Sequence, residues 1–253
     1  RSTLVRSSAA SDVYKRQILD RRGLQAHKAW FYFDEEFVCL GAGICNAKGK
    51  AEVFTTLNQC NRNGKVQYMT NGKKQTLKNG SIQTVADWIL HGQTAYFNLL
   101  PQTEYKITCD TALFSLNANH GIRPQQGKYA YVVHPSIPST SAADKYAAKM
   151  PIKVLANTEK IQAVRHEKLR ITEIIFYQPG ELKLENGDIL ATDTPCALLW
   201  KEKEKRIHIA NPRCESENPE KATITLIQNG QSKQILLEMP QKEEAGKSST
   251  ASY

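Results

Sequence analysis

The sequence predicts an all-β protein built from antiparallel β-sandwiches. Short runs rich in β-branched and aromatic residues follow one another from Ala29 onward. Asn-Gly, the dipeptide that best tolerates the positive φ angles of a type I′ hairpin turn, occurs five times, at 63–64, 71–72, 79–80, 186–187 and 229–230. Turn signals at this density favour antiparallel hairpins over β-α-β units.

Local patterns predict the individual strands. Residues 65–70 and 73–78 flank one Asn-Gly turn and form one expected hairpin. Residues 223–227 and 234–237 flank another turn and form a second hairpin. Strand-like alternation also appears at 128–133 and 171–177.

One helix is expected, and it marks a domain boundary. Residues 142–149 follow three cap candidates, Ser139, Thr140 and Ser141, and stop before Pro151. We therefore predict a β-domain over 18–138, a linker with this short helix over 139–150, and a second β-domain over 151–240. The polar tail at 241–253 is expected to fray.

The first seventeen residues look foreign to the rest. They are basic and Ser-rich, and they lack the apolar segment that a signal peptide contains. Residues 12–17 can be back-translated into DNA that resembles the end of a transposase adapter used in sequencing. Our hypothesis is that 1–17 is an assembly artefact and that native coding starts near Ile18.

Composition excludes some function classes. The chain has 253 residues and a net charge of +9, a balance that can indicate a polyanionic partner. No block of Lys and Arg with interleaved aromatic residues appears, which argues against nucleic acid. No apolar run approaches the roughly 18 residues of a membrane span. A solvated surface of mixed charge explains the imbalance without any partner.

The six cysteines do not predict a metal site. None forms a CxxC pair, and no histidine lies at zinc-ligand spacing from them. Cys39, Cys109 and Cys196 lie in apolar or alternating runs typical of buried thiols. The sequence does not decide whether Cys39 or Cys45 forms a disulfide with Cys60.

Several side chains could bind a ligand, and each also has a structural interpretation. His120 could face a ligand from a loop, or its ring could bond to backbone in a turn. The amides of 55–59 could bind sugar hydroxyls or pair with loop backbone. Trp30, Trp88 and Trp200 could stack on sugars, but their apolar surroundings favour core packing.

Residues 34–36, Asp-Glu-Glu, could transfer protons or bind a cation. Their position between two strand-like runs favours an exposed hairpin turn. There is no Gly-rich phosphate loop, no GxSxG and no HExxH motif. The residues by themselves therefore indicate two β-domains and no active site.

Four stretches, taken in order, resemble polysaccharide lyase family 8, which includes chondroitin AC, hyaluronate and xanthan lyases. They are 28–44 (KAWFYFDEEFVCLGAGI), 55–59 (TTLNQ), 120–121 with 129–135 (HG and YAYVVHP), and 154–166 with its VLANT and QAVRH segments. Cys60 departs from the family pattern, in which a basic residue more often follows the Asn-Gln pair.

The resemblance implies the later part of a central β-supersandwich, followed by a smaller C-terminal β-sandwich. It also implies β-elimination at a uronic acid, with an Asn that neutralises the carboxylate and a Tyr, assisted by His and Arg, that transfers the proton. Those groups belong to a helical N-terminal toroid that no position here matches. We therefore assign no catalytic residue, no metal and no cofactor, and we expect this part alone to be inactive.

The implied partners are an acidic polysaccharide and the α/α-toroid of the same protein, in an extracellular or periplasmic location. Four polar residues at predicted strand ends beside the family motifs are candidates for substrate contact: Asn58, Gln59, His120 and Arg123. The alternative function is a carbohydrate-binding or cell-surface adhesion module without lyase activity. A third alternative is that these domains only brace the toroid.

Overall fold

The computed structural model describes residues 23–211 and 219–253. The proposed artefact at 1–17 lies outside this range, as does Cys214. Among the described residues, contacts group Phe33–Met150 and the residues before Ala29 into a first unit. Pro151–Tyr253 and Ala29–Tyr32 form a second unit.

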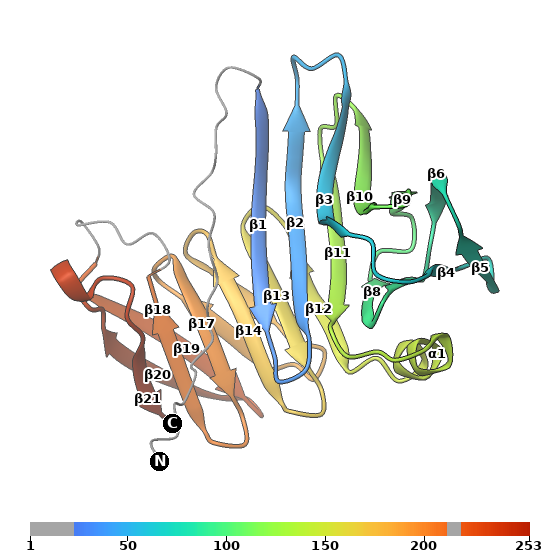
Figure 1. The fold of residues 1–253 in the computed structure, drawn as a ribbon. Coiled ribbons are helices and arrows are strands. Elements are labelled where there is room, and N and C mark those ends of the chain that lie inside the picture. The colour runs from blue at the N-terminus through green and yellow to red at the C-terminus, as the bar shows by residue number, and fades with distance from the viewer. Residues whose placement is uncertain (1–22, 212–218) are drawn as a thin grey trace. The chain divides into compact units, whose positions relative to one another are not determined.

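The first unit contains two antiparallel sheets (Figure 1). The larger has the order β1-β2-β11-β8-β7-β4-β5. Its strands are β1 (Leu24–Tyr32, whose residues from Ala29 onward are grouped with the second unit), β2 (Phe37–Asn46), β11 (Gly127–His134), β8 (Thr94–Asn98), β7 (Trp88–His91), β4 (Val66–Thr70) and β5 (Lys73–Leu77). The smaller has the order β3-β10-β9-β6, formed by β3 (Glu52–Asn61), β10 (Leu113–Ile122), β9 (Glu104–Cys109) and β6 (Gly80–Val85).

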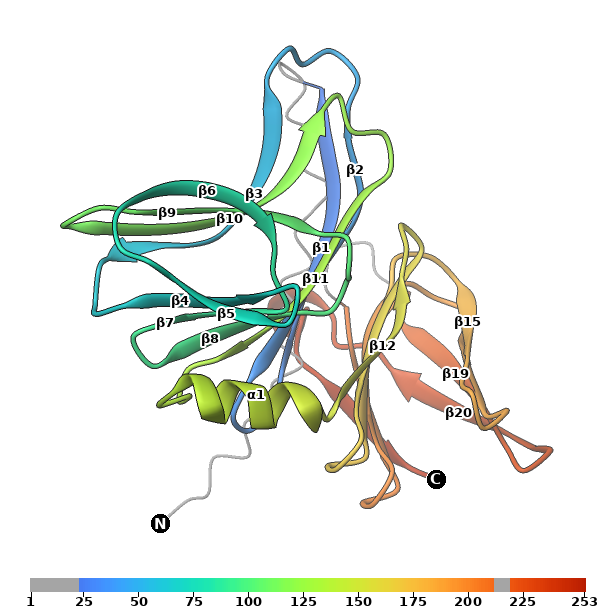
Figure 2. The same ribbon diagram turned by 90° about the vertical axis from the view of Figure 1, so that its right-hand side faces the viewer.

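The core of the first unit lies between β7 and β8 on one side and β9 and β10 on the other (Figure 2). The ring of Phe114 on β10 stacks on His91 at 4.1 Å and lies 6.4 Å from the ring of Tyr96. Tyr105 on β9 donates a hydrogen bond to Asn98 at 3.1 Å. These contacts join the two sheets face to face, as in a sandwich.

Both expected Asn-Gly hairpins are confirmed. Asn71 and Gly72, between β4 and β5, have φ angles of 49° and 69°. Asn229 and Gly230 have φ angles of 49° and 77°. Positive φ at both central residues defines the type I′ turn, whose twist matches that of the flanking strands.

The helix α1 (Thr140–Ala148) begins two residues before the expected start. Ser139 caps it, because its side chain accepts a hydrogen bond from the amide of Ala142 at 3.2 Å. The ring of Tyr146 packs 4.6 Å from that of Phe97. Trp88 Nε1 donates to Asp144 at 3.1 Å, so α1 is attached to β7 and β8 (Figure 2).

The second unit is a sandwich of a six-stranded and a four-stranded sheet. The larger sheet contains, in order, β12 (Ile152–Asn157), β13 (Ile161–His166), β14 (Ile171–Phe176), β17 (Cys196–Lys201), β18 (Arg206–Ala210) and β21 (Ser249–Ser252). The smaller contains β15 (Gly180–Lys183), β16 (Ile189–Thr192), β19 (Lys221–Gln228) and β20 (Gln231–Glu238). Phe176 and Trp200 from one sheet pack in one core with Ile224 and Leu226 from the other. The predicted fold class is therefore confirmed.

The polar segment 241–253 does not fray as expected. A 3₁₀ turn at Lys242–Glu244 leads into β21, which pairs with β18. Tyr253 accepts a hydrogen bond from Trp200 Nε1 at 2.6 Å. The exposed edge of β18 supplies backbone partners that composition alone does not reveal. No helix within the described residues is long and apolar enough to cross a membrane.

Candidate functional site: a polar pocket in the first unit

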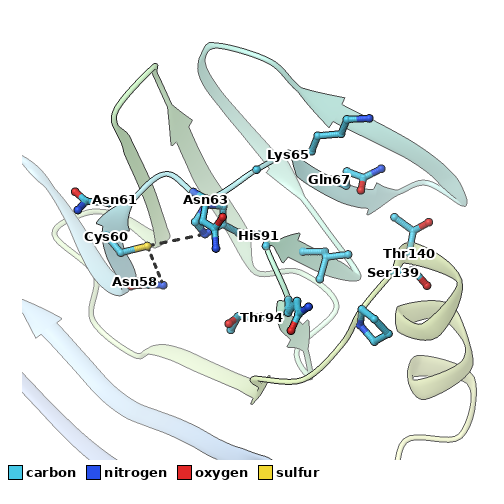
Figure 3. A pocket seen from close by; sticks show the side chains of 15 residues that line it. Asn58, Cys60, Asn61, Asn63, Lys65, Gln67, His91, Thr94, Ser139 and Thr140 are labelled. Atoms are coloured by element: carbon cyan, nitrogen blue, oxygen red, sulfur yellow. Dashed lines mark hydrogen bonds between the residues drawn. The ribbon is translucent and has the colours of Figure 1, made fainter.

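A polar pocket of about 820 Å³ opens in the first unit (Figure 3). We call it the amide pocket, after the five carboxamide side chains that line it: Asn58, Asn61, Asn63, Gln67 and Gln93. Its walls come from the end of β3, the β3–β4 connection, the β7–β8 turn and the residues that lead into α1. Its volume lies within the range of about 300–1,000 Å³ that is usual for small-molecule sites.

Asn58 is held in place on β3. Its Nδ2 donates to the hydroxyl of Tyr96 at 2.5 Å and to Sγ of Cys60 at 3.6 Å. Tyr96 is buried, and burial raises the pKa of its hydroxyl to about 12. Both amide protons of Asn58 therefore have partners, and its side-chain carbonyl oxygen is the remaining polar atom of the carboxamide.

His91 lies next to Cys60, and its hydrogen bond to the backbone fixes the ring in one tautomer. Its Nε2 accepts the backbone N–H of Asn63 at 2.8 Å, so the proton of the neutral ring is on Nδ1. That Nδ1 lies 3.9 Å from Sγ of Cys60. Burial, and after it the charge of Arg62, lowers the pKa of His91, which keeps the ring neutral.

A neutral His91 with Nδ1 already protonated cannot take the proton of the Cys60 thiol. In cysteine–histidine catalysis, an adjacent imidazole takes the thiol proton. The Cys60–His91 pair therefore does not have the arrangement of a thiol nucleophile and its general base.

The β7–β8 turn has a conformation that requires glycine. Gly92 has a φ angle of +62°, and a Cβ at this position would lie 3.3 Å from the carbonyl oxygen of Asn63. The next residue, Gln93, accepts the backbone N–H of Ile137 at 2.8 Å. The turn thus connects the β3–β4 side of the pocket to the segment before α1.

The structure separates the four candidate contact residues. Asn58 lines the amide pocket, whereas Gln59, the next residue of β3, is exposed and does not line it. His120 pairs with the hydroxyl of Thr55 at 2.8 Å. Arg123 has a φ angle of 54° and donates to the carbonyl of Gly49 at 3.0 Å.

The structural interpretation of His120 assumed a hydrogen bond between its ring and the backbone. The ring pairs instead with a side chain, that of Thr55. Burial, and after it the charge of Lys28, lowers the pKa of His120 to about 4. Gly121 has the positive φ angle expected for it, at 73°.

Sequence reasoning missed most of the pocket. In the sequence, Asn63 is only a turn signal, and Lys65 and Gln67 are only strand residues. The available signal was the concentration of carboxamides at 58–67, but their common orientation depends on the fold.

The other candidates resolve into structural roles. Cys39, Cys45 and Cys60 carry free thiols, so neither Cys39 nor Cys45 forms a disulfide with Cys60. Trp88 and Trp200 are buried in the core, as predicted, and Trp30 is half-buried.

Residues 34–36 form the turn between β1 and β2, as predicted, but Glu36 is buried rather than exposed. One ligand atom each from Glu35, Glu36 and His134 lies within 4.8 Å of the others, a grouping that could hold a cation. His134 was not linked to these acids in the sequence. In this group, His134 Nε2 lies 3.8 Å from a carboxylate oxygen of Glu35, so these two side chains are partners of each other without a metal.

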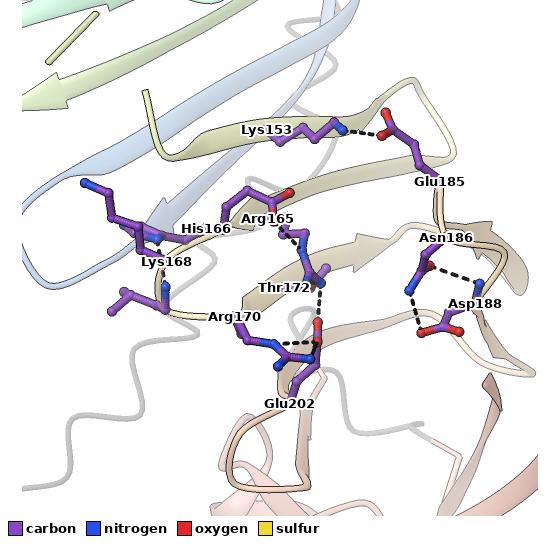
Figure 4. Close-up of polar contacts among 12 residues, drawn as sticks. Lys153, Arg165, His166, Lys168, Arg170, Thr172, Glu185, Asn186, Asp188 and Glu202 are labelled. Carbon is purple, nitrogen blue, oxygen red and sulfur yellow. Dashed lines mark hydrogen bonds and ion pairs between the residues drawn. The ribbon is translucent and has the colours of Figure 1, made fainter. Parts of the chain in front are cut away.

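A charge cluster in the second unit connects neighbouring strands (Figure 4). Glu202 bonds to Arg165 and, at 3.1 Å, to Nη2 of Arg170. Arg165 also contacts Glu167 at 3.2 Å and Thr172 at 3.2 Å. Each charge has a protein partner, so this cluster is structural.

Two family models match the chain. The model of the polysaccharide lyase family 8 super-sandwich domain matches residues 7–112. The model of the family's C-terminal β-sandwich domain matches residues 153–220.

Individual relatives agree with these matches. Chondroitinase-AC of Pedobacter heparinus is 36% identical over 247 residues, which are 90% of this chain and 35% of that protein. A hyaluronate lyase of Thermasporomyces composti is 29% identical over 215 residues, 75% of this chain and 27% of that protein. A solved structure of chondroitinase AC lyase is 32% identical, with a TM-score of 0.80, and covers 90% of this chain and 36% of that one. The chain therefore spans about a third of the length of these relatives.

Proposed function

The chain belongs to polysaccharide lyase family 8, and from this premise we propose that it is the non-catalytic β-part of a lyase. The parent enzyme would cleave uronic-acid-containing polysaccharides, of the chondroitin or hyaluronan kind, by β-elimination. The observation that carries the proposal is the 36% identity to a chondroitinase-AC over 90% of this chain.

The chemistry of the amide pocket supports a binding role for this part. Within the described residues, the one pairing of Cys with His in the pocket lacks a base for the thiol. A β-elimination also needs a group that neutralises the uronate carboxylate and a base for the C5 proton. We propose that both lie outside this chain, on a helical toroid of the parent protein.

We further propose that Asn58, Gln59, His120 and Arg123 contact the acidic polysaccharide in the assembled enzyme. Asn58, Gln59 and His120 lie among the last four residues of β3 and β10, and Arg123 directly follows β10. We place the parent in an extracellular or periplasmic location, where its polymeric substrates occur.

The proposal is tested by expressing the full-length gene and the 18–253 fragment in parallel. Both are incubated with chondroitin sulfate, hyaluronan and xanthan, and absorbance of the unsaturated uronate product is followed. We expect product from the full-length protein alone. Product from the fragment would show that it carries its own catalytic groups, and no product from either would contradict a lyase parent.

A second candidate function is a carbohydrate-binding module without lyase activity. The observation in its favour is that the amide pocket is built from residues of the first unit only. The two candidates differ in the same assay, because a binding module would retain the polymer without forming the unsaturated product.

A further inference from the structure

We infer that the amide pocket binds one anionic sugar unit of an acidic saccharide, with Lys65 as the group that recognises the anion. This inference rests on the proposed function, because it names a binding site for the same class of polymer. It goes further in assigning recognition of the anion to Lys65, a residue that the family resemblance did not single out.

The chemical groups on the walls fit a sugar. A carboxamide offers one acceptor oxygen and two donor protons, which match the hydroxyl and acetamido groups of a saccharide. Five carboxamides line the pocket, and Thr94, Ser139 and Thr140 add hydroxyl groups. An apolar ligand would leave these groups without partners, which costs free energy for each of them.

The charge of the walls selects an anion. Lys65 is the charged lining residue, and no carboxylate is among the residues that line the pocket. The neighbouring Arg62 adds positive charge, although its guanidinium is bonded to Asn79 and to the carbonyls of Gly64 and Asp110. A cation would find no charged partner here, whereas a carboxylate or a sulfate ester would find one.

The inner part of the site is preorganised. Asn58 is bonded to Tyr96 and Cys60, and His91 is held by the Asn63 amide and by stacking on Phe114. Lys65 and Asn63 are exposed at the rim, where a ligand can reach them (Figure 3). Side chains that are already fixed lose little conformational entropy when a ligand binds.

The test measures binding by the 253-residue chain, using isothermal titration calorimetry with defined tetrasaccharides. The probes are hyaluronan, chondroitin 4-sulfate, unsulfated chondroitin and carboxyl-reduced hyaluronan. We expect Lys65→Gln to weaken binding about tenfold, the loss of one charge-assisted contact, and Lys65→Arg to retain it. Lys233→Gln, which removes an exposed lysine on β20 of the second unit, is the matched control and should bind like the wild type.

The probes identify the anion. Loss of binding on carboxyl reduction assigns the uronate carboxylate to Lys65, and binding only by the sulfated tetrasaccharide assigns the sulfate ester. Equal affinity of Lys65→Gln and Lys233→Gln for every probe would overturn the inference, as would undiminished binding of carboxyl-reduced, unsulfated saccharide.

Asn58→Ala gives a second measure of the same site, since it removes one of the carboxamides that line the pocket. Circular dichroism of each variant checks that it is folded. Failure of the inference is distinguishable from failure of the proposed function. If the inference alone fails, the full-length protein is an active lyase and Lys65→Gln does not weaken binding. If the proposed function fails, binding still depends on Lys65 but no product forms.

Discussion

Gly92 is subject to two constraints at one Cα atom. Its φ angle of +62° is strained for any residue with a Cβ, and an added Cβ would lie 3.3 Å from the Asn63 carbonyl. We expect Gly92→Ala to lower the free energy of unfolding by about 2 kcal/mol. Gly72→Ala is the matched control, because Gly72 has a φ angle of +69° and open space around it. Urea denaturation of both variants isolates the effect of the Asn63 contact, and equal losses would show that this contact does not constrain the turn.

His120 gives the protein a pH dependence at the acid end. Its pKa lies at about 4 when folded, below the value of about 6.5 in an unfolded chain. The unfolded state then binds the proton more readily, so the contribution of His120 is complete above about pH 6.5 and is lost as the pH falls toward 4. With allowance for solvent screening at a half-buried ring, the loss is on the order of 1–2 kcal/mol.

The measurement is urea denaturation of the wild type and His120→Gln at pH 7.5, 5.5 and 4.5. Glutamine keeps a polar group within reach of the Thr55 hydroxyl but does not titrate. We expect the stability of the variant to fall less steeply on acidification, and parallel curves would contradict the assignment. His91 and His208, whose pKa values are also lowered, contribute equally to both curves.

At the scale of elements, sequence patterns located hairpins well and contact partners poorly. Asn71-Gly72 and Asn229-Gly230 specify their turns through local φ preferences, so the flanking strands follow from the sequence. The pairing of β3 with β10 brings together residues more than fifty positions apart, and no local preference encodes it. The amide pocket depends on long-range contacts of the same kind, and of the four candidate contact residues it is lined by Asn58 alone.

The Glu202 carboxylate joins neighbouring segments of the second unit through its ion pairs with two arginines. Glu202, in the turn after β17, is 9% exposed and pairs with Arg165 on β13 and with Arg170 before β14. We expect Glu202→Gln to lower the free energy of unfolding by about 2 kcal/mol, because it leaves a partly buried guanidinium without its carboxylate.

Glu185→Gln is the control for this prediction. Glu185 is 75% exposed and pairs with Lys153 in the same unit, so its loss should cost less than about 1 kcal/mol. Thermal unfolding of the two variants compares them directly. Similar shifts in Tm would show that burial does not strengthen the Glu202 pairs.

At the scale of the whole molecule, ordered family motifs carried more information than any single residue. The resemblance at 28–166 agrees with family models that match 7–112 and 153–220. Composition and spacing alone indicated β-sandwiches but no activity, since sandwich folds serve many functions. The edge strand β21 was missed because Ser, Thr and Ala at 249–251 resemble a polar tail until β18 offers them partners.

The strand β14 does not show the alternation of buried and exposed residues that is typical of a half-buried strand. Strict alternation would leave one of its faces exposed, yet every residue from Thr172 to Phe176 is buried, including Glu173. The Glu173 carboxyl accepts the backbone N–H of Tyr32, from the segment Ala29–Tyr32 of the same unit. Burial raises the pKa of Glu173 well above its ordinary value, against the smaller opposing effects of the Tyr32 amide and Lys201.

An acid with a raised folded pKa binds its proton more tightly in the folded state. Its stabilising contribution is therefore complete below about pH 4.5 and is lost as the pH rises toward the folded pKa, the opposite direction to His120. Glu173→Gln keeps an acceptor for the Tyr32 amide but cannot ionise. We expect the variant to gain stability over the wild type between pH 5 and pH 8, by on the order of 2 kcal/mol. Urea denaturation at both pH values measures this, and a constant difference between the two proteins would mean that Glu173 does not change its protonation in this range.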